Sequence, residues 1–139
     1  MINDIYRMGL DLWTRWTEMW NRDPSLAREL VAPVFTLHLT LPSRAEQTAI
    51  TTPEAVHEWV AQHCARFDRL VFSTEVGPFV DTVRGVVAGP WNADTIVEGK
   101  PQPVCGMDTI AFRDGRITEY WTISKPVDAF GRWATSPGK

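Results

Sequence analysis

The sequence predicts a single α+β domain in which a curved, mainly antiparallel sheet wraps around N-terminal helices. Apolar residues recur at helical spacing in residues 4–21 and 53–67, whereas after Asp68 they alternate with polar residues in a series of strands. Helices followed by consecutive strands are typical of an α+β layer with an antiparallel sheet. We therefore expect a cone with one open mouth.

The first helix is expected from Asn3 or Asp4 to Asn21. One side of this stretch carries Ile5, Gly9, Leu12, Trp13, Trp16, Met19 and Trp20 at helical spacing. Asp23-Pro24 is a cap followed by a first-turn proline, which predicts a short second helix through Leu30. Pro33 is expected to end that helix.

A strand is expected from Val34 to Leu41, because its residues alternate. One side carries Phe35, Leu37, Leu39 and Leu41. The polar stretch Pro42–Thr51 is predicted to be a loop. Thr52-Pro53-Glu54 repeats the cap-plus-proline signal and begins a third helix. The buried stripe of that helix is Val56, Trp59, Val60, Cys64 and Phe67.

The rest of the chain predicts strands at Leu70–Val76, Val80–Thr95, Val104–Arg113 and Arg116–Ser124. Gly89-Pro90 lies inside the second of these and predicts a bulge or sharp bend, which supports a curved sheet. Pro126 is expected to stop the last strand. We expect one domain over residues 1–126 and a C-terminal tail over 127–139.

The composition is that of an ordinary globular protein, with 139 residues, 44% hydrophobic and 22% charged. A net charge of −3 without a basic run argues against nucleic-acid binding. No apolar run approaches the length of a membrane helix, and residues 1–5 lack the basic start and apolar stretch of a secretion signal, so we expect neither. Cys64 and Cys105 lack metal-ligand spacing, so we expect no metal and two buried free thiols in a reducing cytoplasm, with a disulfide as the alternative.

Asp108 is the most informative residue, because it falls in phase with apolar residues of its strand. It shares one face with Val104, Gly106, Ile110 and Phe112. A two-residue turn at Asp114-Gly115 would place Phe112 opposite Ile117, Ile110 opposite Glu119 and Asp108 opposite Trp121.

An acid beside a tryptophan on an apolar surface is costly unless it is paired or protonated. Such groups often carry out proton chemistry, and burial should raise the pKa of Asp108. The alternative is a structural acid, satisfied by backbone N–H groups or by an arginine such as Arg84.

Three segments resemble a known family: residues 20–24, the strand ending near His38, and residues 106–121. They resemble the SnoaL-like branch of the nuclear transport factor 2-like superfamily, which includes polyketide cyclases, ketosteroid isomerase, limonene epoxide hydrolase and scytalone dehydratase. The resemblance implies a cone-shaped α+β barrel with a deep apolar pocket, usually in a homodimer. Thr122 departs from the pattern, since many relatives have an aspartate there. Residues 91–95 replace a Thr-His-Thr-Gly type turn.

The resemblance implies that Asp108 is the catalytic acid/base, with His38 and Asp94 as helpers. His38 could shuttle a proton or orient a water. The residues expected to line the substrate pocket are Tyr6, Trp13, Trp16, Trp59, Trp91, Phe112 and Trp121. Core packing is the alternative for the tryptophan stripe of the first helix. The Tyr6 hydroxyl could reach an oxyanion.

The sequence therefore predicts a cofactor-independent acid/base enzyme of a hydrophobic small metabolite, of the polyketide-cyclase or isomerase type. No phosphate-cradling glycine loop and no Gly-x-Ser-x-Gly motif is present. A non-catalytic ligand-binding or dimerisation module and an epoxide hydrolase or epoxide-opening cyclase stay open as alternatives. The expected partners are a hydrophobic small molecule and a second copy of the chain, without nucleic acid or membrane.

Overall fold

The computed structural model describes residues 2–39, 44–127 and 131–134, with the backbone alone for 44–46. Its helical elements are α1 (Ile2–Asn21), η1 (Pro24–Leu26), α2 (Ala27–Leu30), α3 (Arg44–Ala49) and α4 (Pro53–Cys64). Asp23 and Thr52 cap η1 and α4 with their side-chain oxygens, as their sequence patterns predict. None of the described helices is long and apolar enough to span a membrane.

The described chain forms one seven-stranded sheet. Its strands are β1 (Val31–Leu39), β2 (Arg69–Ser73), β3 (Phe79–Asp81), β4 (Val86–Val97), β5 (Lys100–Pro101), β6 (Val104–Arg113) and β7 (Arg116–Pro126). The main order is β1-β7-β6-β4-β2, while β3 and β5 both pair with β4. β1 runs parallel to β7, and the other pairings are antiparallel.

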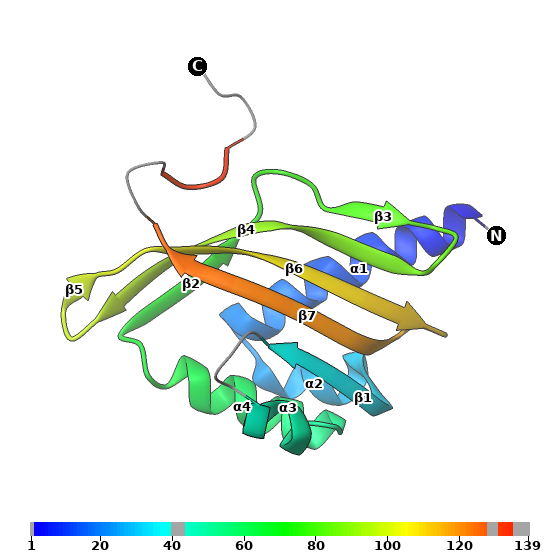
Figure 1. Cartoon of the computed structure of the whole chain (residues 1–139), viewed down its shortest axis with the longest axis horizontal. Coiled ribbons are helices and arrows are strands. Elements are labelled where there is room, and N and C mark those ends of the chain that lie inside the picture. Colours follow the sequence, from blue (N-terminus) through cyan, green and yellow to red (C-terminus); the bar gives the residue numbers. More distant parts are fainter. Residues whose placement is uncertain (1, 40–43, 128–130, 135–139) are drawn as a thin grey trace.

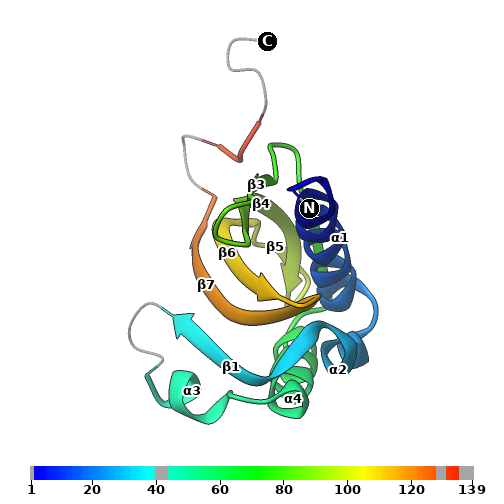
Figure 2. The ribbon, with the colours of Figure 1, turned by 90° about the vertical axis from the view of Figure 1, so that its right-hand side faces the viewer.

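The α+β class predicted from the sequence is confirmed, but the sheet is open and does not close into a barrel. β1 and β2 are its edges, and the strands curl from one to the other with α1 across the open side (Figures 1 and 2). Helix α1 packs against β2 and β3, and α4 packs against β1. The helices thus cover the apolar inner face that closure would otherwise have to bury.

β1 begins at Val31, earlier than predicted, and Pro33 lies inside it. Pairing with β7 is interrupted between Val31 and Thr36, so the missing N–H of Pro33 costs no ladder hydrogen bond. The predicted end of this strand, Leu41, lies outside the described residues. Within the predicted loop over residues 42–51, the structure contains the short helix α3.

The strand predicted over Val80–Thr95 is two strands, β3 and β4, and this expectation was wrong. The chain reverses between them because the Asp81 carboxylate accepts hydrogen bonds from the backbone N–H groups of Val83 and Arg84, each 3.0 Å long. Gly85 follows with a φ of +69°, a conformation that suits glycine. The sequence carried a usable signal for this turn, because Val80 and Val83 fall on opposite faces of a strand and Asp81 and Gly85 are turn residues.

The β6–β7 hairpin contains a β-bulge, and this corrects the predicted register. Phe112 lies opposite Ile117 as predicted, but the next pair is Ala111 with Glu119, so Thr118 is the extra residue. Beyond the bulge, every side chain of β7 changes face relative to the prediction.

The predicted pairs Ile110–Glu119 and Asp108–Trp121 are therefore wrong. Ile110 lies opposite Tyr120, and Asp108 lies opposite Thr122. Tyr120 points inward and is 3% exposed, whereas Trp121 points outward and is 37% exposed.

Part of the predicted tail packs against the outer face of the sheet. The amide of Asn92 accepts a 3.0 Å hydrogen bond from the backbone N–H of Trp133 and donates one of 3.0 Å to its carbonyl. The Trp133 indole donates to the carbonyl of Gly106 at 3.1 Å.

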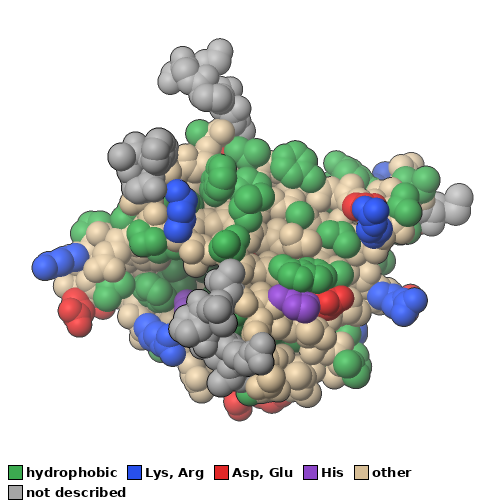
Figure 3. All heavy atoms as spheres, viewed as in Figure 1, with side chains coloured by type: hydrophobic (Ala, Val, Ile, Leu, Met, Phe, Trp, Pro, Cys, Tyr) green, Lys and Arg blue, Asp and Glu red, His purple; other side chains and the backbone are tan. Residues whose placement is uncertain are grey.

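Hydrophobic side chains are spread over the face seen in Figure 3, and Met107, Trp121 and Ile123 are exposed.

Candidate active site

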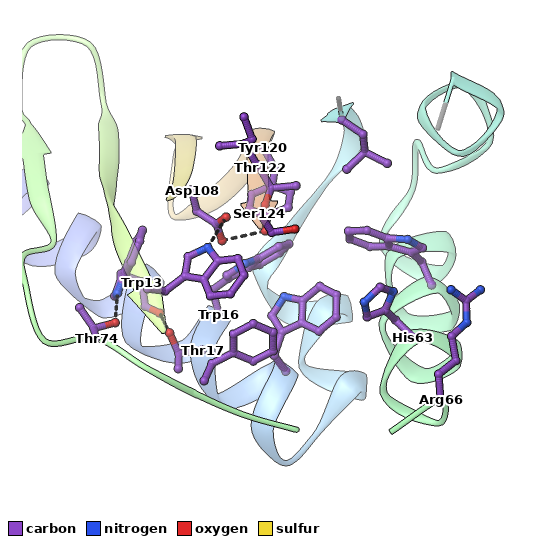
Figure 4. A pocket seen from close by; sticks show the side chains of 16 residues that line it. Trp13, Trp16, Thr17, His63, Arg66, Thr74, Asp108, Tyr120, Thr122 and Ser124 are labelled. Carbon is purple, nitrogen blue, oxygen red and sulfur yellow. Dashed lines mark hydrogen bonds between the residues drawn. The ribbon is translucent and has the colours of Figure 1, made fainter. Parts of the chain in front are cut away.

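A cavity of roughly 340 Å³ lies between the inner face of the sheet and helices α1 and α4 (Figure 4). Its walls are largely indole: Trp13, Trp16 and Trp20 come from α1, Trp59 from α4 and Trp91 from β4. Hydroxyl groups of Thr17, Thr74, Thr122 and Ser124 are interspersed. Rigid aromatic walls with a few polar groups are typical of sites for flat, mostly apolar ligands.

Asp108 is the one carboxylate among the described residues that line this cavity, and it is 7% exposed. Its Oδ1 accepts a 2.8 Å hydrogen bond from Nε1 of Trp91. Its Oδ2 accepts a 2.7 Å hydrogen bond from the Tyr120 hydroxyl. The carboxyl group is thus held from both sides by neutral donors, and no cation of the described residues shifts its pKa. Figure 4 shows it turned into the cavity.

Burial raises the pKa of Asp108 from its ordinary value of 3.8 to about 6, because the carboxylate loses its hydration inside the protein. Hydrogen bonds from Tyr120, Thr122 and Trp91 favour the charged form and offset part of this rise. The group is therefore mostly ionised at neutral pH and still able to hold a proton. This is the behaviour required of a general base that returns its proton later in the reaction.

Burial and the neighbouring Asp108 raise the pKa of Tyr120 well above its usual value. Tyr120 therefore stays protonated over the whole physiological range, and its hydroxyl is a permanent donor to the acid.

Gly106 lets the Trp91 indole approach Asp108. Trp91 lies opposite Gly106, and a Cβ on Gly106 would collide with the Trp91 ring, 2.8 Å from its Cε2, and with the carbonyl of Ile123. Gly89 lies opposite Asp108 itself. A Cβ there would come within 3.4 Å of the Trp13 ring. The bare backbone of Gly106 thus allows Trp91 to lie across β6 and reach the carboxylate.

The structure brings five of the predicted site residues to this cavity: Asp108, Trp13, Trp16, Trp59 and Trp91. The other five lie elsewhere. Phe112 is buried in the core near Gly9, at the far end of the inner face. Tyr6 is 48% exposed, because the buried stripe of α1 begins at Gly9 and its first turns extend past the cavity.

His38 lies outside the cavity, which corrects its expected place beside Asp108. Its Nε2 is 2.7 Å from Oε2 of Glu119, and its ring stacks on Trp121 with the centroids 4.7 Å apart. The bulge turned both partners outward, and His38 pairs with Trp121 in the β1–β7 register. Asp94 is also exposed, on the opposite face from its neighbours Ala93 and Thr95, and is 3.9 Å from Arg132.

Sequence reasoning missed Tyr120, Thr122, His63 and Arg66. Tyr120 was missed because the bulge reverses the faces of β7, and no residue pattern predicted the bulge. The departure of Thr122 from the family pattern was a usable signal, because it marked the position that now faces Asp108. Among the described residues, no group of three or more His, Cys, Asp or Glu side chains is arranged to hold a metal ion.

The sheet is open and curved, and helices lie across its inner face. Together they enclose an aromatic cavity with one buried acid. This arrangement is that of the nuclear transport factor 2-like fold. Residues 13–120 match the family model of the SnoaL-like domain, and the chain belongs to this family. None of the curated proteins compared with the chain matches it.

Solved structures agree with this assignment. A candidate polyketide cyclase from Acidithiobacillus ferrooxidans has a TM-score of 0.72 and 20% identity, over 85% of this chain and 88% of that one. A candidate isomerase from Bacillus subtilis has a TM-score of 0.73 and 16% identity, over 87% of this chain and 88% of that one.

A loop-truncated variant of IdmH gives a TM-score of 0.67 and 27% identity, over 84% of this chain and 92% of that one. Wild-type IdmH is a candidate polyketide cyclase from Streptomyces antibioticus. These likenesses show that the chain shares the fold of these proteins.

Proposed function

We propose that this protein is a cofactor-independent acid/base enzyme that acts on a carbonyl compound with a flat, hydrophobic skeleton. The observation that carries the proposal is Asp108, a buried acid with a pKa of about 6 in an indole-lined cavity. Perturbed acids of this kind cluster at functional sites. The cyclase and isomerase names among the structural neighbours support the same class of reaction.

The proposed step begins with a C–H bond next to the substrate carbonyl. Ionised Asp108 takes this proton on a carboxylate oxygen, and the C–H electron pair moves into the carbonyl group to form an enolate. In a cyclisation, the enolate carbon then forms a C–C bond to a second carbonyl carbon of the same molecule. Asp108 returns its proton to the new alkoxide oxygen. In an isomerisation, it returns the proton to a different carbon.

The neighbours of Asp108 prepare it for this step. Trp91, Tyr120 and Thr122 donate hydrogen bonds to the carboxylate, which has about four lone-pair sites, so one site is left to accept the substrate proton. These neutral donors orient the carboxylate and lower its pKa only in part, so that the pKa stays above its ordinary value.

The same hydrogen bonds favour a second candidate, a non-catalytic ligand carrier. Both carboxylate oxygens already have donors, as expected of an acid kept for structural reasons. In that case the cavity would bind a flat ligand and release it unchanged. The predicted homodimer is compatible with both candidates and stays a prediction.

Proton exchange separates the two candidates without knowledge of the natural substrate. We would follow the exchange of the α-protons of 2-tetralone, a flat bicyclic ketone, into deuterated water by NMR. The wild type is expected to accelerate exchange, and Asp108→Asn to lose roughly 10²-fold or more of it while still binding the ketone. Asp94→Asn is the matched control and should retain the activity, since Asp94 is exposed.

A carrier would bind 2-tetralone without accelerating exchange in the wild type. Equal exchange in the wild type and in Asp108→Asn would remove Asp108 from the chemistry and overturn the proposal.

A further inference from the structure

The cavity has a cationic end that the proposed chemistry does not use. Arg66, which follows α4, and His63 within it both line the cavity. Figure 4 shows the two side chains on the α4 side, with aromatic rings between them and Asp108. A charged guanidinium therefore stands at one end of the aromatic walls and the buried acid at the other.

The charge of Arg66 is not neutralised by a carboxylate of the described residues. The ion pairs of the described residues are all made by other cations, so no described carboxylate pairs with Arg66. The nearest acid in the sequence, Asp68, accepts a 2.8 Å hydrogen bond from the backbone N–H of Gly99. The Arg66 side chain is exposed to solvent, so an incoming ligand can reach it.

Neighbouring side chains restrict what can lie beside Arg66. The ring of His63 packs against Trp20, Trp59 and Phe67, with centroid distances of 5.5, 6.4 and 5.7 Å. Of these rings, His63, Trp20 and Trp59 line the same cavity as Arg66 and give its cationic end an apolar border. An anion that bound there would be less screened than on open surface, where ion pairs contribute little.

We propose that Arg66 binds a carboxylate group of the ligand, so that the substrates are flat aromatic or polycyclic carboxylic acids whose reacting carbonyl lies at the Asp108 end. This inference rests on the proposed function for the role of Asp108, but the anion subsite itself is a property of binding. A guanidinium matches a carboxylate with two parallel N–H···O bonds, which is stronger and more specific than a single contact.

The two charges also set the direction of the ligand. Ionised Asp108 repels a carboxylate, and Arg66 attracts it, so the anionic end is kept away from the acid. The apolar skeleton then lies along the indoles, with its other end at the carboxyl group of Asp108. A neutral ligand would lack this preference and could enter in either direction.

The test compares two probes of the same shape, 2-naphthoate and its neutral amide 2-naphthamide, by isothermal titration calorimetry at neutral pH. The wild type should bind the carboxylate roughly fivefold to tenfold more tightly than the amide. Arg66→Gln should abolish this preference and leave the affinity for the amide unchanged. Arg66→Lys should keep part of it, since the charge remains without the planar fork.

Arg69→Gln is the matched control. It removes the same charge three residues away, from an exposed position of β2 that does not line the cavity. It should leave the carboxylate preference intact, and the preference of the wild type should weaken with added salt. An equal loss in Arg66→Gln and Arg69→Gln would mean general attraction by net charge and would overturn the subsite.

The remaining outcomes separate this proposal from the proposed function. If Arg66→Gln keeps the preference while Asp108→Asn loses proton exchange, the subsite is wrong and the acid/base role stands. If Arg66→Gln loses the preference but the wild type exchanges no protons, the subsite stands for a carrier. If neither probe binds, the cavity does not take flat aromatic ligands, and the proposed ligand class is wrong.

Discussion

The hydroxyl of Tyr120 donates a 2.7 Å hydrogen bond to Oδ2 of Asp108 from the adjacent strand. The two residues are diagonal neighbours, because Asp108 lies opposite Thr122 and Tyr120 lies opposite Ile110. The contact exists only because the bulge at Thr118 shifts β7 by one residue. It joins the acid to a donor that stays protonated.

Tyr120→Phe should raise the pKa of Asp108 further, since it removes a hydrogen bond that favours the carboxylate. A hydrogen bond to a charged group contributes about 1.5 kcal/mol or more, which corresponds to roughly one pH unit. The acidic limb of the pH–rate profile for proton exchange should move upward by about that amount. Tyr6→Phe is the control, because Tyr6 is the other tyrosine of the chain and is exposed. It should leave the profile unchanged.

Asp108→Asn should make the protein more stable at neutral pH. The folded state raises the pKa of Asp108 from 3.8 to about 6, so it binds more protons than the unfolded state between those values. Stability therefore falls as the pH rises through this window, and the difference between the two pKa values corresponds to about 3 kcal/mol above it. Asparagine carries no charge, so it avoids the cost of a buried carboxylate. Part of this gain is lost because the amide forms weaker hydrogen bonds with the donors around position 108.

Urea unfolding over a pH series measures this gain. Asp108→Asn should exceed the wild type by about 1–2 kcal/mol at neutral pH, and the difference should shrink as the pH falls toward 3.8. A mutant that is less stable than the wild type at neutral pH would show that the carboxylate is structural.

Gly106→Ala should displace the Trp91 indole, because the added Cβ collides with its ring and with the carbonyl of Ile123. We expect a loss of about 1–3 kcal/mol in the free energy of unfolding and a marked fall in proton exchange. Gly89→Ala adds the same group at 3.3–3.4 Å from its neighbours and should cost less. Equal effects of the two substitutions on exchange would contradict the role of Gly106 in placing Trp91.

His38→Gln should leave proton exchange unchanged, although the sequence suggested His38 as a helper of Asp108. The histidine lies outside the cavity and interacts with Glu119 and Trp121. Its removal should lower stability by less than about 1 kcal/mol, because half-exposed ion pairs contribute little. A large fall in exchange with unchanged unfolding would return His38 to the mechanism.

Much of the fold could be read from local patterns. Asp23-Pro24 and Thr52-Pro53 predicted where helices begin, because caps and first-turn prolines act within a few residues. The range of β6, Val104–Arg113, was predicted as observed, since its alternation is uninterrupted. The turn between β3 and β4, which Asp81 makes through its hydrogen bonds, was missed, although Val83 breaks the alternation and Gly85 favours a turn.

The sequence by itself determined the α+β class, the inward face of β6 and the identity of the buried acid, because these depend on periodicity within single elements. Tertiary structure decided which side chains surround Asp108. The bulge placed Tyr120 instead of Trp121 on the inner face. His38 needed no tertiary information, since alternation along its strand already puts it on the side opposite the buried Phe35 and Leu37. Register between strands is set by the packing of the whole sheet against α1 and α4, and one residue of shift reverses every face beyond it.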